Sequence, residues 1–105
     1  MGDRQLSNQV VVRYRTRPEA ADENARLVEA VFASLAEVAP KDFAYATFRL
    51  ADGVTFVHVA RQVEGPSPLA TLPTFVEFQR GLGARCVEPP APSEATVVGS
   101  YGRLP

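Results

Sequence analysis

The sequence predicts an α+β fold in which a four-stranded antiparallel sheet carries two helices on one face. Three observations support this fold class. An Asp-Gly turn at 52–53 joins two alternating runs between Phe43 and Gln62, which predicts a hairpin. Two further segments, up to residue 39 and from residue 73, have the apolar spacing of amphipathic helices. Strand-like runs precede the first helix and close the chain, which gives the order βαββαβ.

Length and charge indicate one ordinary globular domain. The chain has 105 residues, with 46% hydrophobic and 22% charged residues and a net charge of −1. We expect residues 1–8 to form a flexible N-terminal tail and residues 9–105 to form a single domain. The near-zero net charge gives no electrostatic footprint for nucleic acid or an anionic membrane.

Cysteine usage argues against a disulfide framework and against a zinc site. Cys86 is the only cysteine and His58 the only histidine, so neither a disulfide within the chain nor a structural zinc cluster can form. A reducing cytoplasm is the compartment that fits best. No apolar run approaches the roughly 20 residues that span a bilayer, so no membrane partner is expected.

The first strand and helix follow directly from the sequence pattern. β-Branched residues make Val10–Arg15 a strand. Thr16 stands three residues before Glu19, which predicts a capping box, and Pro18 suits the first turn of a helix. This helix is expected to end at Pro40, because the residue before a proline is pushed out of the α region.

The hairpin is expected to have a two-residue type I′ turn at Asp52-Gly53, which fixes its register. The predicted pairs are Ala51 with Val54, Arg49 with Phe56, Thr47 with His58, Tyr45 with Ala60, Leu50 with Thr55, Phe48 with Val57, and Ala46 with Val59. One face is apolar and is expected to pack under the helices: Ala46, Phe48, Leu50, Val57 and Val59. The other face is mixed and is expected to remain open: Tyr45, Thr47, Arg49, Phe56 and His58, with Phe43 beside them.

The C-terminal part predicts a helix and a final strand. Thr71 and Pro73 mark a helix start, and Ser67 is expected to cap a short turn before it. One face of this helix carries Leu72, Phe75, Phe78, Leu82 and Cys86, while Gly81 and Gly83 weaken it. The run 89–92, Pro-Pro-Ala-Pro, is expected to be a stiff connector to a last strand at 94–101.

The order of elements is that of the split βαβ, ferredoxin-like arrangement. An open sheet face carrying aromatic residues has nothing in a chain of this size to cover it. A second copy placed sheet against sheet about a two-fold axis would cover it. We therefore expect a homodimer.

At this level the chain resembles the antibiotic biosynthesis monooxygenase domain family, within the dimeric α+β barrel superfamily. The resemblance covers about residues 9 to 101. It is carried by "VVVRYRTRPE" leading into the first helix, "FAYATFRLADGVTFVHVARQVEG" as the hairpin, and "LPTFVEFQRGLGARC" as the second helix. It implies a pocket lined by aromatic and polar side chains, and cofactor-independent oxygenation of a small aromatic or quinol-like compound. The haem-degrading branch of the family relies on a tryptophan, an asparagine and a helix-borne histidine. This chain has no tryptophan and its histidine falls on a predicted strand, so that branch is set aside.

The candidate site residues lie on the mixed face of the hairpin. His58 is the only side chain whose ordinary pKa lies near neutrality, so it is the candidate catalytic base toward a phenolic proton. The candidate substrate-binding residues are Tyr45, Phe56, Thr47 and Arg49. Tyr14 could also orient a ligand through its hydroxyl. Each also has a purely structural interpretation, such as a strand histidine at a dimer interface or an aromatic filler of the core.

Three functions remain open from the sequence. The first is a cofactor-independent monooxygenase. The second is a non-catalytic homodimer that binds a small hydrophobic molecule. The third is a structural or regulatory dimer in which no cavity remains over His58. Fold-level analogy does not decide among them.

Overall fold

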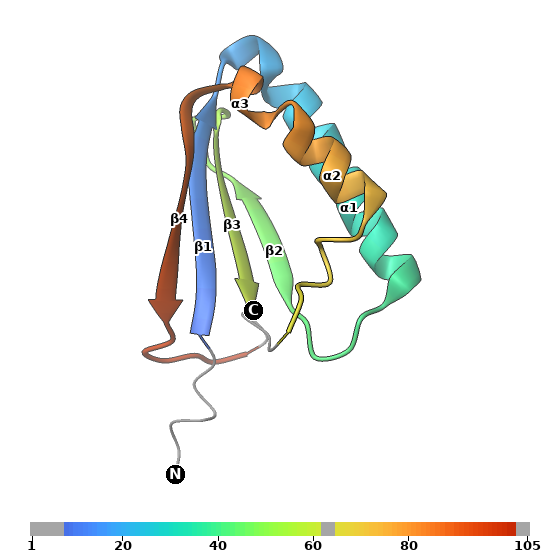
Figure 1. Cartoon of the computed structure of the whole chain (residues 1–105). Coiled ribbons are helices and arrows are strands. Elements are labelled where there is room, and N and C mark those ends of the chain that lie inside the picture. Colours follow the sequence, from blue (N-terminus) through green and yellow to red (C-terminus); the bar gives the residue numbers. More distant parts are fainter. Residues whose placement is uncertain (1–7, 62–64, 103–105) are drawn as a thin grey trace.

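The computed structural model describes residues 8–61 and 65–102 and shows the predicted two-layer arrangement. The strands are β1 (Asn8–Thr16), β2 (Tyr45–Arg49), β3 (Thr55–Arg61) and β4 (Cys86–Thr96). They form one antiparallel sheet in the order β2-β3-β1-β4. The helices α1 (Ala21–Val38), α2 (Pro73–Arg80) and α3 (Leu82–Arg85) lie on one face of it (Figure 1). The ferredoxin-like βαββαβ fold is confirmed.

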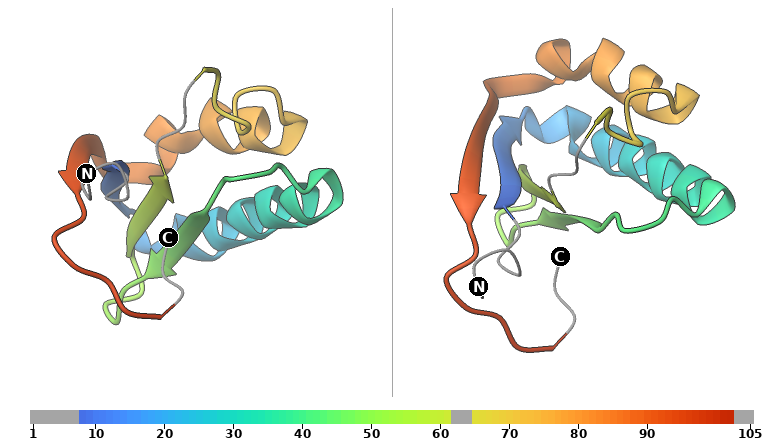
Figure 2. Two further views of the ribbon diagram at one scale, coloured as in Figure 1. Left: turned by 90° about the horizontal axis from the view of Figure 1, so that it is seen from below. Right: turned by 60° about the horizontal axis from the view of Figure 1, so that its bottom comes forward.

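Figure 2 shows the same layers from two other directions, with both long helices on one side of the sheet. Of the predicted N-terminal tail, residues 1–7 lie outside the described part of the chain, and Asn8 is the first residue of β1. Gln62, the predicted end of the hairpin, also lies outside the described residues.

The predicted hairpin register is correct, but the predicted turn type is wrong. All five pairs from Tyr45–Ala60 to Arg49–Phe56 are present. Gly53 has a φ of 80°, whereas Asp52 does not have the positive φ that a type I′ turn requires. Instead, the Asp52 carboxylate accepts hydrogen bonds from the backbone N–H groups of Val54 and Thr55, at 3.0 and 2.9 Å. The aspartate therefore closes the turn through its side chain.

The predicted orientation of the hairpin faces is reversed in the structure. Phe56 and His58 are buried under the helices, at 1% and 6% exposure, whereas Phe48 is 45% exposed on the open face. The reason lies in β1, where Tyr14 is opposite Phe56 and Arg13 is opposite Val57. Turning the Val57 face inward would also bury the Arg13 and Arg15 side chains of β1, and a buried unpaired charge is very costly.

The start of the first helix differs from the predicted capping box. The Thr16 hydroxyl donates to the Val54 carbonyl at 3.3 Å, and Glu19 forms an ion pair with Arg17 at 2.9 Å. A short 3₁₀ turn, Pro18–Ala20, precedes α1 instead. The predicted helix end is confirmed, since Ala39 adopts a left-handed conformation directly before Pro40.

The C-terminal elements are shifted relative to the prediction. Helix α2 ends at Arg80, α3 follows as a separate turn, and Cys86 already belongs to β4. The proline-rich segment expected to be a connector lies within β4, and the strand ends at Thr96 instead of reaching residue 101. β4 is an edge strand that pairs only with β1. Proline is tolerated there because one side of an edge strand needs no ladder hydrogen bonds.

The main core lies between the sheet and the helices. Its buried members are Tyr14, Ala21, Val28, Val31, Phe56, Leu69, Leu72, Phe78 and Leu82. Tyr14 and Phe56 come from the sheet, and the others come from the helices and the segment before α2. Ser67 caps that segment as predicted, accepting the Leu69 N–H at 3.2 Å.

Candidate functional site

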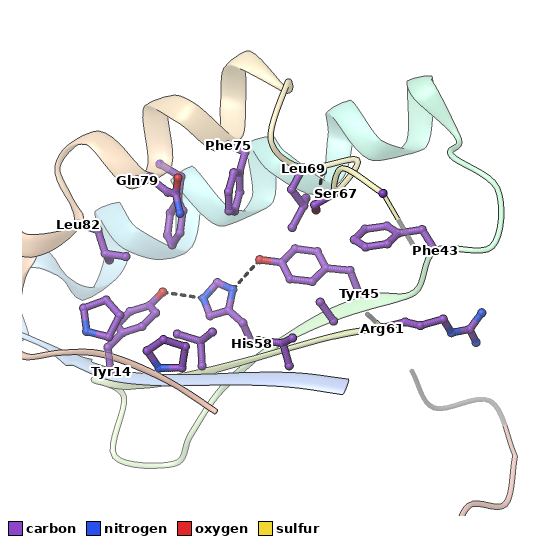
Figure 3. Close-up of a pocket in the computed structure, with 17 residues that line it drawn as sticks. Tyr14, Phe43, Tyr45, His58, Arg61, Ser67, Leu69, Phe75, Gln79 and Leu82 are labelled. Carbon is purple, nitrogen blue, oxygen red and sulfur yellow. Dashed lines mark hydrogen bonds between the residues drawn. The ribbon is translucent and has the colours of Figure 1, made fainter. Parts of the chain in front are cut away.

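A cavity of about 540 Å³ opens between the sheet and the α2–α3 side of the helical layer. Figure 3 shows Tyr14, His58 and Tyr45 side by side along its sheet wall, with Phe75 and Leu82 on the helical wall. The lining residues are mostly apolar or aromatic: Val10, Val12, Tyr14, Phe43, Tyr45, His58, Ala60, Arg61, Gly65, Ser67, Leu69, Phe75, Phe78, Gln79, Leu82, Pro90 and Pro92. The pocket that the resemblance implied is therefore present, on the helix side of the sheet.

His58 is held at the centre of the sheet wall by three hydroxyl groups. Its Nε2 atom lies 2.7 Å from the Tyr14 hydroxyl oxygen. Its Nδ1 atom lies 2.7 Å from the Tyr45 hydroxyl oxygen and 3.1 Å from that of Thr47. Both ring nitrogens are hydrogen-bonded, which fixes the orientation of the imidazole ring.

Burial keeps these groups neutral at physiological pH. It lowers the pKa of His58 from 6.5 to about 4. Burial raises the pKa of Tyr45 to about 12, opposed by a hydrogen bond with Thr47, and it also raises the pKa of Tyr14, opposed chiefly by Asn24. The site thus presents a neutral imidazole, which can accept a proton, between two protonated phenols.

A second pair of buried polar residues lies behind Tyr14. Asn24, at 0% exposure on α1, donates from Nδ2 to the Tyr14 hydroxyl oxygen at 2.9 Å. Arg85, at 6% exposure, donates from Nε to Asn24 Oδ1 at 2.9 Å and from Nη2 to the Phe78 carbonyl at 2.8 Å. Neither Asn24 nor Arg85 is among the residues that line the cavity.

Aromatic rings form a rigid frame around the histidine. Tyr14 stacks on Phe56, with ring centroids 5.5 Å apart, and Tyr45 stacks on Phe32 at 5.0 Å. The Phe78 ring lies 5.5 Å from the His58 ring. Such contacts suit a flat aromatic ligand, which can add to the same stack.

The charges around the cavity favour a neutral or anionic ligand. Arg61 is the one charged residue among the described lining residues, and no carboxylate is among them. Arg61 Nε is buried without a hydrogen-bond partner in the described chain, and the Arg61 side chain extends away from the His58 wall of the cavity (Figure 3). Within residues 8–61 and 65–102, no group of three or more His, Cys, Asp and Glu side chains is placed to hold a metal ion.

The structure brings together only some of the predicted site residues. His58 and Tyr45 line the cavity, and Thr47 contacts His58 from just outside it. Phe56 lies outside the cavity because it packs behind Tyr14. Arg49 is also outside, since its guanidinium pairs with Asp22 at 3.1 Å and lies over the Phe56 ring. The assignment of Phe56 and Arg49 as substrate-binding residues therefore does not fit this geometry.

Sequence reasoning missed Asn24 and Arg85. Asn24 falls on the apolar stripe of α1, three residues after Ala21 and four before Val28. Arg85 falls three residues after Leu82 on the apolar side of its helix. A polar residue on an otherwise apolar stripe is the signal that could have identified both, because buried polar groups require partners.

The Cys86 thiol is given no role in the site. The Cys86 thiol is half-buried, and burial raises its pKa against the opposing charges of Arg85 and Arg17. That direction disfavours the reactive thiolate.

None of the helices in the described segments is long and apolar enough to cross a bilayer. A cytoplasmic location stays a prediction.

The comparisons with known proteins identify the fold. No family model matches the sequence, and no curated protein matches it. Among solved structures, Rv0793 from Mycobacterium tuberculosis is similar, with 20% identity, a TM-score of 0.65, and coverage of 90% of this chain and 98% of that one. An antibiotic biosynthesis monooxygenase is similar at 15% identity, with a TM-score of 0.65 and coverage of 88% and 99%.

A third similar structure carries a ligand. It is a monooxygenase from the gene ActVA-Orf6 of Streptomyces coelicolor in complex with nanaomycin D. The identity is 19% and the TM-score 0.59, over 97% of this chain and 96% of that one. At this level of identity, the similarities establish the shared fold over nearly the whole chain.

Proposed function

We propose that this chain, which has the fold of the antibiotic biosynthesis monooxygenases, is a cofactor-independent monooxygenase of a small aromatic or quinol-like compound. One observation carries the proposal. The aromatic-lined cavity of about 540 Å³ has a neutral histidine on its wall, held between two phenols. A cavity of this size is in the range of small-molecule sites.

In the proposed reaction, the Tyr14–His58–Tyr45 group removes the phenolic proton of the ligand. Neutral His58 is the final proton acceptor, and the resulting phenolate is electron-rich enough to reduce dioxygen. One oxygen atom enters the ring at a C–H position, the other leaves as water, and the phenol becomes a quinone. One phenol and one O₂ therefore give one quinone and one water, and no external reductant is needed.

The cavity also fits the proposed ligand class. Its Tyr, Phe and His rings offer stacking surfaces for an aromatic ligand. The binding of nanaomycin D by the ActVA-Orf6 monooxygenase supports a polycyclic quinone as a first probe for this chain.

Oxygen uptake by the wild-type chain tests the proposal. The protein is mixed with each of a panel of hydroquinones and naphthols, and oxygen consumption above the protein-free rate is followed. Labelled ¹⁸O₂ should place one ¹⁸O atom in the quinone product. Uptake that never exceeds the protein-free rate with any member of the panel would count against a monooxygenase.

One observation favours a second function, a non-catalytic protein that binds a small hydrophobic molecule. Both nitrogens of His58 are already engaged by protein hydroxyl groups, so the ring could serve only to shape the wall. Saturable binding of nanaomycin D or a hydroquinone without product would support this function. The cavity itself argues against the third interpretation, in which the space over His58 is filled.

A homodimer remains part of the proposal, with a changed interface. Phe43, Tyr45 and Phe56 lie on the helix side of the sheet, so they cannot form the open face as predicted. The open face instead carries Val11, Ala46, Phe48, Leu50, Val57 and Val59. Phe48 and Leu50 are 45% and 38% exposed, and a second sheet packed on them would remove this apolar surface from water.

A further inference from the structure

Four buried side chains and the partly buried Tyr45 form a continuous hydrogen-bonded chain that ends at the cavity. It runs from Arg85 through Asn24, Tyr14 and His58 to Tyr45, with successive donor–acceptor distances of 2.9, 2.9, 2.7 and 2.7 Å. Figure 3 shows the last two links on the cavity wall. These hydrogen-bonded side chains come from α3, α1 and three strands of the sheet. The first two, Arg85 and Asn24, lie outside the cavity, and they determine which group donates in each later hydrogen bond.

Arg85 sets the direction of the first link. A guanidinium can only donate, so Asn24 Oδ1 must accept from Arg85 Nε. The amide NH₂ group of Asn24 then faces Tyr14 and donates to its hydroxyl oxygen. Arg85 is fixed in turn by its bond to the Phe78 carbonyl and by its position over the Phe78 ring, 5.4 Å from the centroid.

The Asn24 hydrogen bond in turn determines which group donates between Tyr14 and His58. Because the Tyr14 oxygen accepts from Asn24, its own hydrogen is left to donate to His58 Nε2, 2.7 Å away. If Nε2 carried the proton instead, Tyr14 would accept two N–H groups. Its hydroxyl hydrogen would then have no acceptor among the described residues, at 1% exposure. Tyr14 therefore donates to His58.

We infer that Arg85 and Asn24 are positioning residues that hold His58 in the Nδ1–H tautomer, so that the Tyr45 hydroxyl hydrogen is not taken up by His58 and is left for another acceptor, either Thr47 Oγ1 or a ligand oxygen. Nδ1–H donates to the Tyr45 oxygen, with the Thr47 oxygen also within 3.1 Å. Tyr45, which lines the cavity, can then donate to a ligand oxygen. The tautomer stands independently of any activity, whereas this role toward a ligand rests on the proposed function.

The assigned direction also defines the path of the proton in the proposed reaction. The O–H bond of the ligand breaks as Tyr14 takes that proton, and Tyr14 passes its own hydrogen to His58 Nε2. An imidazolium and a phenolate result. The Tyr45 hydroxyl, which lies on the other side of the His58 ring from Tyr14, is placed to donate to a different oxygen atom of the ligand.

NMR of the single histidine tests the tautomer without a ligand. His58 is the only histidine, so ¹⁵N-histidine labelling gives one imidazole whose protonated nitrogen is identified by its ¹⁵N shifts and couplings to the ring hydrogens. Above pH 7 we expect a neutral ring with the proton on Nδ1. A ring protonated on Nε2, or an equal mixture of tautomers, would overturn the inference.

Asn24→Asp tests the origin of that tautomer. A carboxylate accepts from Arg85 and also from the Tyr14 hydroxyl, so the chain reverses and His58 should change to the Nε2–H form. Arg85→Met is the second variant, in case the first does not fold. It frees the Asn24 amide to rotate and should give both tautomers. Arg80→Met, at an exposed arginine of α2, is the matched control and should keep Nδ1–H.

The outcomes separate the two proposals. Retention of pure Nδ1–H in both Asn24→Asp and Arg85→Met would show that these residues do not set the tautomer. Because no ligand or oxygen enters the measurement, that failure is distinct from a failure of the chain to consume oxygen.

Discussion

At the residue scale, the protein combines a buried neutral histidine with hydroxyl groups that satisfy both of its nitrogens. A histidine on the open sheet face would have stayed near its ordinary pKa. On the helix side, burial lowers the pKa of His58 from 6.5 to about 4. This keeps the base unprotonated over the whole physiological range, and the same shift makes the imidazole a weak acceptor for a phenolic proton.

The lowered pKa predicts a pH dependence of stability. Between pH 6.5 and 4 the unfolded chain binds a proton at His58 while the folded chain does not. The free energy of unfolding should therefore fall as the pH falls through this window, by up to about 3 kcal/mol from this residue. Urea unfolding of the wild type and of His58→Gln at several pH values measures the difference, which should shrink toward acid pH. A constant difference would contradict the pKa shift.

Removal of the buried Tyr14 hydroxyl should affect stability more than removal of the exposed Tyr101 hydroxyl. Tyr14→Phe leaves His58 Nε2 and the Asn24 amide without a hydroxyl partner, which should cost about 1–3 kcal/mol of stability. Tyr101→Phe is the matched control, since Tyr101 is 97% exposed and should have no effect. Thermal unfolding compares the three chains. Equal melting temperatures for wild type and Tyr14→Phe would mean that the Tyr14 hydroxyl is not part of a stabilising network.

At the element scale, the break between α2 and α3 places Arg85 within hydrogen-bond distance of Asn24, which in turn bonds to Tyr14. Gly81 marks the break, and a Cβ atom there would lie 3.1 Å from Arg85 Nη1. Arg85 cannot move away easily, because it is buried and held by two hydrogen bonds. A Cβ atom at Gly83, by contrast, would have no neighbour within 4 Å.

These two glycines give a matched pair of substitutions. Gly83→Ala should raise stability by up to about 1 kcal/mol, because alanine has the higher helix propensity and no contact opposes it. Gly81→Ala should lower stability, because its Cβ would crowd Arg85 and because Gly81 lies between the two helices, where alanine gains no helix propensity. Chemical denaturation checks both. A stabilised Gly81→Ala variant would show that Arg85 is free to shift.

Some features of the fold could be predicted from local sequence signals and others could not. The order of elements, the hairpin register and the end of α1 at Pro40 follow from local signals, namely turn residues, periodicity and proline. The inward face could not be chosen from the hairpin alone, because its apolar side held Phe48 and Val57. Only the pairing with β1 couples the Val57 side to Arg13, and that pairing is a tertiary contact.

The same limit applies to the site. His58, Tyr45 and Thr47 share a predicted face, so sequence reasoning could group them. Asn24 and Arg85 come from helices and lie 61 residues apart in the chain, and no local pattern predicts their contact. The proline-rich part of β4 has the local composition of a connector, and its strand conformation depends on pairing with β1.

At the scale of the whole molecule, the helical layer covers the site side of the sheet and leaves the opposite side uncovered (Figure 2). The uncovered side is apolar in its middle strands, with Phe48 and Leu50 exposed. It carries charge in β1, where Arg15 pairs with Glu88 of β4 at 2.9 Å. Association through this face would leave the cavity on the far side of each sheet intact.

Phe48→Glu should weaken the proposed dimer. In a two-fold interface the substitution acts twice, so a loss of about 1.5 kcal/mol on each side raises the dissociation constant at least ~100-fold. Val76→Glu is the control, because Val76 is similarly exposed, at 44%, but lies on α2 in the helical layer. Sedimentation velocity at micromolar concentration reads the result. A wild-type chain that sediments as a monomer there would refute the dimer.

The central claim is that the cavity over His58 is a working site whose proton acceptor is this histidine. Oxygen consumption with a responsive hydroquinone, compared among wild type, His58→Gln and Tyr101→Phe, tests it most directly. Glutamine can still bond to both tyrosines but does not accept a proton near neutrality. We predict that Tyr101→Phe matches the wild type and that His58→Gln falls at least ~100-fold, the lower range for loss of a general base. Wild-type rates in folded His58→Gln would contradict the claim.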